Sequence, residues 1–180
     1  MSHKLSDEIS LIKACSQGDH TAFKKIYNHY KGKMFSICLR YMNTHDEAQD
    51  VLQDGFIKVY HKISTFSFAG SFEGWMKRIF VHTCIEFIRK QKQHKDINEL
   101  TEMDNITVSE MTVSSMDADK LIELIKELPK GYRTVFNMYV IDGYSHKQIS
   151  AALQISESTS KTQLFKARKQ LQIWLKGWFE

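Results

Sequence analysis

The chain has 180 residues and a net charge of +4, which allows one large domain or two small ones, each with a modest core. It contains no apolar run near the roughly 18 residues of a membrane helix and no signal-peptide pattern, so we expect a cytoplasmic protein without direct membrane insertion. Three widely separated cysteines and the lack of a His cluster predict neither a disulfide framework nor a metal site, and we expect no cofactor.

The first half of the chain is predicted to form four helices, because apolar residues recur at three- and four-residue steps. These helices are expected at about 5–16, 20–42, 44–60 and 75–90. Thr44 and Glu47 have the spacing of a capping box and therefore predict the start of the third helix. Residues 64–74 are predicted to form a loop before the fourth.

Residues 93–117 are predicted to form a flexible linker, since they lack periodicity and are rich in Thr, Ser, Asn and acids. Residues 96–119 carry seven acids and no Lys or Arg, a net charge of −7. The flanking blocks are basic, with net charges of +6 over 1–95 and +5 over 120–180. This alternation indicates two nucleic-acid-facing domains joined by an acidic segment.

Four further helices are predicted after the linker. Pro129 ends the first of them and Gly143 ends the second. Ser145 caps the third, with Gln148 completing a second capping box, and Ser156 caps the last.

No segment shows the alternation typical of a strand, so the expected fold is all-α. We expect two small helical domains, at 1–92 and 118–180, joined by the acidic linker at 93–117.

The last two predicted helices have the form of a helix-turn-helix, which places side chains in the DNA major groove. From Lys161 to Lys176 the second helix carries five cations and no acid. Its first turns hold side chains long enough to reach phosphates and base edges. These are Thr159, Lys161, Thr162, Gln163 and Lys166. A solvated basic face on a packing helix is the alternative interpretation.

Four aromatic residues lie within ten positions, beside glycines and just before a basic helix. They are Phe66, Phe68, Phe72 and Trp75, and the helix carries Lys77, Arg78, Arg89 and Lys90. Aromatic rings among cations are typical of sites that stack unpaired bases and hold their backbone. Phe72 and Trp75 could instead close a helical core, whereas Phe66 and Phe68, near glycine, are expected to stay exposed.

A third pattern is an acidic helix face formed by Asp46, Asp50, Gln53 and Asp54. Paired carboxylates can serve acid-base catalysis or metal binding, but no His or Cys lies at ligand spacing. The amphipathic pattern favours a solvated or protein-binding face over catalysis, and we therefore expect no enzyme activity.

Three motifs occur in the same order as in a known family, and the resemblance covers about residues 10–176. The chain is similar to the extracytoplasmic-function (ECF) sigma factors, the minimal form of the bacterial sigma-seventy family. The stretch from Asp50 to Tyr60 is similar to their polymerase-binding helix. The stretch from Phe72 to Arg89 looks like their promoter-melting segment, and Leu128 to Lys169 resembles their second DNA-binding domain.

The resemblance implies a promoter-recognition subunit of RNA polymerase. Its first domain would dock on the clamp helices of the largest polymerase subunit through Asp50, Gln53, Asp54 and Phe56, and the second domain would bind the polymerase flap. The first domain would also open the minus-ten element, through Phe66, Phe68, Phe72, Trp75, Arg78, His82, Arg89 and Lys90. The last helix would read the minus-thirty-five element. This role adds Ser156, Phe165 and Arg168 to the candidate DNA contacts of that helix. The linker would enter the basic RNA-exit channel. The chain would direct transcription of a stress or envelope regulon, and an anti-sigma factor would control the chain.

Some positions differ from the family's usual residues. His82 and Glu86 stand where Asn and Asp are common, and Ser158, Ser160 and Gln163 stand where Gly, Val and Arg are frequent. These positions face DNA in the family, so we expect them to determine this chain's own promoter preference.

A stand-alone helix-turn-helix regulator is the alternative function. It explains the C-terminal pattern, but it leaves the aromatic loop and the acidic helix face without a role.

Overall fold

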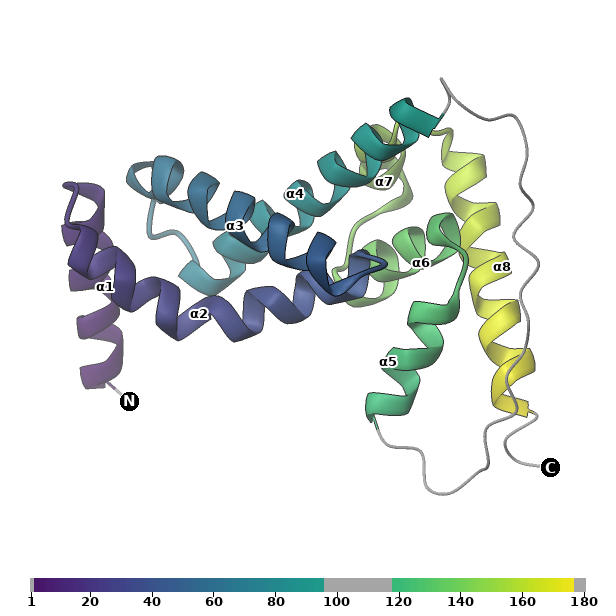
Figure 1. Cartoon of the computed structure of the whole chain (residues 1–180), viewed down its shortest axis with the longest axis horizontal. Coiled ribbons are helices and arrows are strands. Elements are labelled where there is room, and N and C mark those ends of the chain that lie inside the picture. Colours follow the sequence, from purple (N-terminus) through teal and green to yellow (C-terminus); the bar gives the residue numbers. More distant parts are fainter. Residues whose placement is uncertain (1, 96–117, 177–180) are drawn as a thin grey trace. The chain divides into compact units, whose positions relative to one another are not determined.

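The computed structural model describes residues 2–95 and 118–176 (Figure 1). Every regular element in these ranges is helical, which confirms the all-α prediction. The chain divides into two compact units, Met1–Phe87 and Ile88–Glu180. The predicted linker lies outside the described residues except at its start, where a helix continues to Lys95. No helix in the described ranges combines the length and apolar character needed to cross a bilayer.

The first unit is formed by four α-helices and one short 3-10 turn. They are α1 (Ser2–Ser16), α2 (His20–Tyr41), α3 (His45–Lys62), η1 (Ile63–Thr65) and α4 (Phe72–Lys95), the last of which continues past the end of the unit. Helix α4 begins three residues earlier than predicted, because the Ser71 hydroxyl accepts a 3.1 Å hydrogen bond from the Gly74 amide. The first helical turn therefore includes Phe72.

Local caps begin two of these helices. Asp19 accepts hydrogen bonds from the amides of Thr21 and Ala22, at 2.7 and 3.0 Å, and these bonds lower the pKa of its carboxyl. The capping box predicted for Thr44 and Glu47 is confirmed, with both reciprocal bonds present. These bonds satisfy helix-end amides that have no intrahelical partner.

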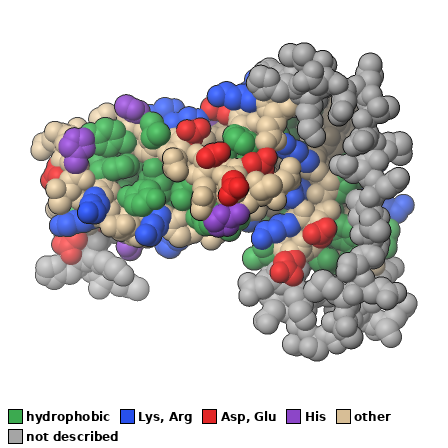
Figure 2. All heavy atoms as spheres, viewed as in Figure 1, with side chains coloured by type: hydrophobic (Ala, Val, Ile, Leu, Met, Phe, Trp, Pro, Cys, Tyr) green, Lys and Arg blue, Asp and Glu red, His purple; other side chains and the backbone are tan. Residues whose placement is uncertain are grey.

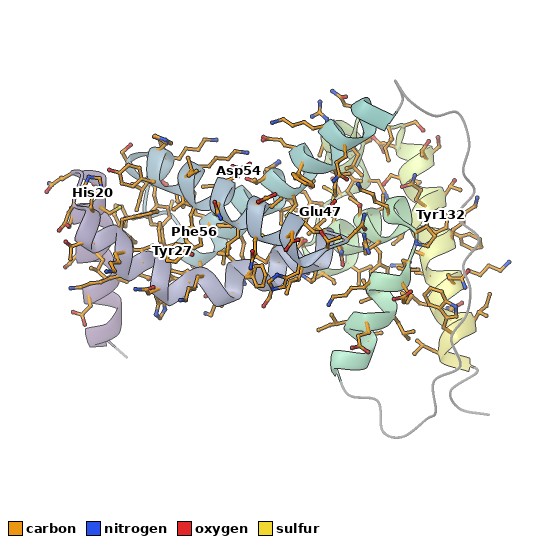
Figure 3. All side chains as sticks on the ribbon, viewed as in Figure 1. His20, Tyr27, Glu47, Asp54, Phe56 and Tyr132 are labelled. Carbon is orange, nitrogen blue, oxygen red and sulfur yellow. The ribbon has the colours of Figure 1, made fainter. Side chains whose placement is uncertain are left out.

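The core of the first unit lies where α2, α3 and α4 meet, and aromatic rings occupy its centre. The ring of Phe56 lies 4.6 Å from that of Tyr27 and 5.2 Å from that of Phe80, measured between centroids. Figure 3 shows Tyr27 and Phe56 in the space between α2 and α3. The three cysteines are buried as free thiols, as expected. Burial raises the pKa of the Cys15 thiol.

Beyond the end of α4, the described residues of the second unit, 118–176, form five helical elements. They are α5 (Ala118–Glu127), α6 (Lys130–Phe136), the π-helical turn η2 (Asn137–Ile141), α7 (His146–Leu153) and α8 (Glu157–Lys176). One buried apolar cluster of this unit joins α5 and the residue after it to α8, and its members are Ile125, Leu128, Ala167 and Leu171. The sequence predicts a plain helix ended by Gly143, but the last part of this helix, Asn137–Ile141, is a π-helix.

The starts of α7 and α8 follow the sequence prediction closely. The capping box of α7 is confirmed: Ser145 and Gln148 exchange bonds of 2.9 and 3.3 Å. Gly143, in the preceding turn, has a φ of +74°, which glycine adopts without a steric cost. Ser156 caps α8, as predicted, by accepting a 3.0 Å bond from the Thr159 amide.

Candidate nucleic-acid and protein interfaces

The acidic face predicted for α3 is exposed. Asp46, Asp50, Gln53 and Asp54 all face solvent. Figure 2 shows acidic side chains gathered over this helix on the visible side of the molecule. Among the described residues, no three His, Cys, Asp or Glu side chains converge in a way that could hold a metal ion. The arrangement is suited to contact with a basic surface of another macromolecule.

Phe56, which the sequence assigns to polymerase binding, does not lie on this exposed face. Phe56 is only 3% exposed, because its position on α3 points toward the aromatic core. The face instead includes Ile57, which is 54% exposed and which the sequence analysis missed. Helical spacing could have identified Ile57, since it lies four residues after Gln53 and therefore on the same side of the helix.

Two of the four aromatic residues in and after the loop belong to the core. Phe66 is 9% exposed and Phe72 is 3% exposed, so the expectation that Phe66 would stay exposed is wrong. The rings of Phe66, Phe72 and Trp75 form a compact group with centroids 5.2 to 5.5 Å apart. Mutual packing of the rings buries Phe66 and Phe72, whereas Trp75 stays half-buried.

Phe68 is the aromatic residue that projects from this loop. It is 45% exposed and has a φ of +59°, a left-handed conformation that is uncommon for a bulky residue. Its ring leans on that of Phe66 at 4.9 Å between centroids. One face of a ring in such a position can accept a stacked base.

Exposed polar residues follow one side of α4 at four-residue steps. Arg78, His82 and Glu86 are exposed on this stripe, and Glu86 forms a 2.5 Å ion pair with Lys58 of α3. Further along α4, Lys90 is exposed and Arg89 is half-buried.

The start of α4 is joined to α2 by an ion-pair network. Glu73 accepts hydrogen bonds from Lys33 of α2 at 2.6 Å and from Lys77 at 2.8 Å. These two ammonium groups, Lys33 first, lower the pKa of the Glu73 carboxyl. The network links the first turns of α4 to α2.

Helix α8 presents a basic exposed face with one large apolar side chain in it. Lys161, Thr162, Lys166 and Arg168 are exposed, and Phe165 is 66% exposed. Ser156 and Ser158 are also exposed at the start of the helix, and Thr159 is half-buried. This composition suits contacts to phosphates, base edges and thymine methyl groups.

Two of the residues expected to set promoter preference contact other helices of the second unit. Ser160 is fully buried, and its hydroxyl lies 2.9 Å from His146 Nδ1 of α7. Gln163 is half-buried, and its amide nitrogen lies 3.3 Å from the position that a Cβ on Gly131 of α6 would occupy. Both side chains therefore contact the helices behind α8, and the expectation that Ser160 faces DNA is wrong.

Tyrosines of α6 and η2 support two cations of this face. Lys166 Nζ lies 5.9 Å from the ring centroid of Tyr132, and the Arg168 guanidinium lies 5.8 Å from that of Tyr139. Figure 3 shows Tyr132 on α6, on the side toward α8. Such cation–π contacts hold a long side chain in place without removing its charge.

Two family models match the chain. One describes sigma-70 region 2 and matches residues 26–94, and the other describes sigma-70 region 4 and matches residues 118–171.

Curated proteins of similar length also match. The ECF RNA polymerase sigma factor SigW of Bacillus subtilis is 31% identical over 89% of this chain and 92% of its own length. The ECF RNA polymerase sigma-E factor of Haemophilus influenzae is 24% identical over 96% of both chains. Each match spans nearly the whole of both proteins, and thus both units of this chain.

Solved structures show the same fold at low sequence identity. The sigma factor RpoE in complex with the anti-sigma factor NepR, from Bartonella quintana, matches with a TM-score of 0.53 and 19% identity, over 86% of this chain and 96% of that one. CnrH in complex with the cytosolic domain of CnrY matches with a TM-score of 0.51 and 18% identity, over 95% and 97%.

Proposed function

Because the chain belongs to the ECF sigma factors of the sigma-70 family, we propose that it binds core RNA polymerase in the cytoplasm and directs transcription from specific promoters. The observation that carries this proposal is the exposed acidic face of α3, with Ile57 beside it. A stand-alone regulator has no use for such a face. The protein acts by binding rather than by catalysis.

Polymerase binding is assigned to Asp50, Gln53, Asp54 and Ile57. The carboxylates attract a basic partner surface and speed the encounter, whereas the isoleucine supplies apolar area that is buried on docking. The partner surface is the clamp helices of the largest subunit. Phe56 supports this face from the core and makes no direct contact.

Strand opening is assigned to Phe68 and to the exposed stripe on α4. Extracting a base from the duplex costs a few kcal/mol, and a stacking ring recovers about 1–3 kcal/mol of it. Arg78 and His82 lie on the exposed side of α4, where they can contact the backbone of the separated strand. Phe66, Phe72 and Trp75 hold the loop in shape rather than contacting bases.

Recognition of upstream duplex is assigned to the exposed face of α8. Lys161, Lys166 and Arg168 supply phosphate contacts, and Thr162 and Phe165 face the base edges. The structural relatives bound to anti-sigma factors support a further proposal, that an anti-sigma factor holds this chain inactive. That partner covers one or more of these faces.

Binding to core polymerase and promoter-dependent transcription test the proposal. Purified chain mixed with core enzyme should yield a complex that makes promoter-dependent transcripts from a library of promoter fragments. The double substitution D50N/D54N should lower the affinity for core enzyme by about tenfold or more. The matched control is Glu123→Gln, a loss of exposed charge on α5.

The result that rejects this function is specific. A chain that binds duplex DNA tightly without core enzyme, and gives no promoter-dependent transcript with it, is a stand-alone regulator.

A further inference from the structure

One side chain of α7 is hydrogen-bonded to α8 within the helix-turn-helix. His146, at the first position of α7, forms a 2.9 Å hydrogen bond through Nδ1 with the Ser160 hydroxyl of α8. Ser160 is fully buried, so its hydroxyl has no access to water if this bond is broken. A buried hydroxyl that loses its partner destabilises the arrangement that buries it. The bond therefore favours one setting of α8 against α7.

The same imidazole also contacts an aromatic residue. The rings of His146 and Tyr139 are stacked, with centroids 4.5 Å apart and planes inclined by 25°. Tyr139 lies on the π-helical turn η2 and also supports the Arg168 guanidinium at 5.8 Å. Helix turns of this wide type are rare and often occur at functional sites.

These contacts form a continuous series from Ser160 through His146 and Tyr139 to Arg168. The series begins and ends on α8, at positions about 12 Å apart along the helix axis. Its middle members come from α7 and η2. Because these side-chain contacts lie off the axis of α8, they restrain the rotation of the helix about that axis.

We propose that His146 is a positioning residue for promoter recognition. It sets the rotation of α8 and so directs Lys161, Thr162 and Phe165 toward the DNA, and through Tyr139 it orients Arg168. The proposal rests on the proposed function, since it assumes that α8 reads upstream duplex. It also gives Ser160 a role without DNA contact: the residue selects the orientation of the helix that makes the contacts.

The test uses the complex of the full chain with core polymerase on a promoter. The variants are His146→Phe, which keeps a ring for stacking, Ser160→Ala, and the double substitution. The measurement is hydroxyl-radical protection of the upstream element relative to the downstream element in the same complex. It is made at a temperature at which circular dichroism shows all variants folded.

Each single variant should weaken upstream protection by about fivefold to tenfold, and the double variant should be no worse than either single one. Downstream protection should persist in all of them. A control variant, Gln172→Ala, removes an exposed side chain of α8 and should leave the pattern unchanged.

Tyr139 provides a second test that does not depend on a buried bond, because this side chain is 36% exposed. Tyr139→Leu removes the stacking surface for His146 and Arg168 and should reduce upstream protection. Tyr139→Phe keeps the ring and should restore it, a contrast that a loss of stability alone does not predict.

If the folded single variants protect the upstream element as well as the unaltered chain does, the role of His146 is overturned. Independent, additive losses in the double variant overturn it too. These outcomes leave the proposed function standing, because the unaltered chain still protects the upstream element. If the unaltered complex gives no upstream protection, the proposed function and this inference both fail.

Discussion

A Cβ atom on Gly55 of α3 would lie 2.3 Å from Cε1 of Phe80 on α4. Real Cβ atoms do not approach other atoms so closely. Phe80 is fully buried and packs edge-on against Phe56, so its ring has little room to move. Helices α3 and α4 thus approach each other at a point where only glycine fits, within the same turn as the acidic face.

Gly55→Ala should therefore destabilise the first unit. Overpacking of a filled core costs about 1–3 kcal/mol. The measurement is urea unfolding followed by circular dichroism.

Gly32→Ala is the matched control, since a Cβ on this α2 glycine meets no atom within 4 Å. This change should stabilise the protein by about 0.5–1 kcal/mol, because alanine favours the helix. Effects of the same sign for the two glycines would show that contact with Phe80 is not the cause.

Phe66 and Phe68 should have separable effects. Phe66→Ala removes a buried ring and should lower the free energy of unfolding by about 3 kcal/mol. Phe68→Ala should leave stability nearly unchanged but weaken promoter opening by about tenfold, if its exposed ring stacks an unpaired base. Permanganate reactivity of thymines in the promoter measures the opening. Normal opening by Phe68→Ala would exclude this residue from base capture.

Glu73 should make a pH-dependent contribution to stability. Its pKa is lowered by Lys33 and Lys77, so the stabilisation is present above the ordinary glutamate pKa of about 4.3 and is lost as the pH falls through the lower folded pKa. Glu73→Gln should cost less than about 1 kcal/mol at neutral pH, because the network is partly exposed to solvent. Thermal unfolding across pH should show the two curves converging in acid, whereas a constant gap would contradict this.

Lys161 should contribute to DNA affinity through a phosphate. Lys161→Ala should weaken binding of the polymerase complex similarly across promoter sequences and reduce the salt dependence of binding by about one unit of slope. Phe165→Ala should instead alter the preference among bases, because an exposed phenyl ring in the groove contacts thymine methyl groups. Binding measured against salt on two promoter variants distinguishes the two. Identical profiles for both substitutions would count against these assignments.

The three thiols should react only after opening of the fold. Cys38 and Cys84 are fully buried and out of reach of a reagent. Burial raises the pKa of Cys15, so little of its thiolate is available at neutral pH. Labelling with a thiol reagent should be slow in the native protein and accelerate with urea in parallel with unfolding. Rapid labelling of Cys15 without denaturant would show that α1 opens by itself.

Helices, caps and exposed charged faces could be predicted from the sequence because they depend on neighbours a few residues away. Thr44 with Glu47 and Ser145 with Gln148 form the predicted capping boxes, since each bond is closed within one helical turn. The exposed acids of α3 likewise follow from helical spacing alone.

Burial of individual rings and hydroxyls could not be predicted in this way. Phe66 and Phe68 lie two positions apart in the same loop, yet one is covered by Phe72 and Trp75 while the other projects into solvent. Ser160 joins His146 across fourteen residues of chain, and helical periodicity contains no information about that pairing. The residues that become buried depend on how helices distant in sequence pack together. That packing buries Ser160, which was expected to face DNA, and gives it a contact with His146 that orients its own helix.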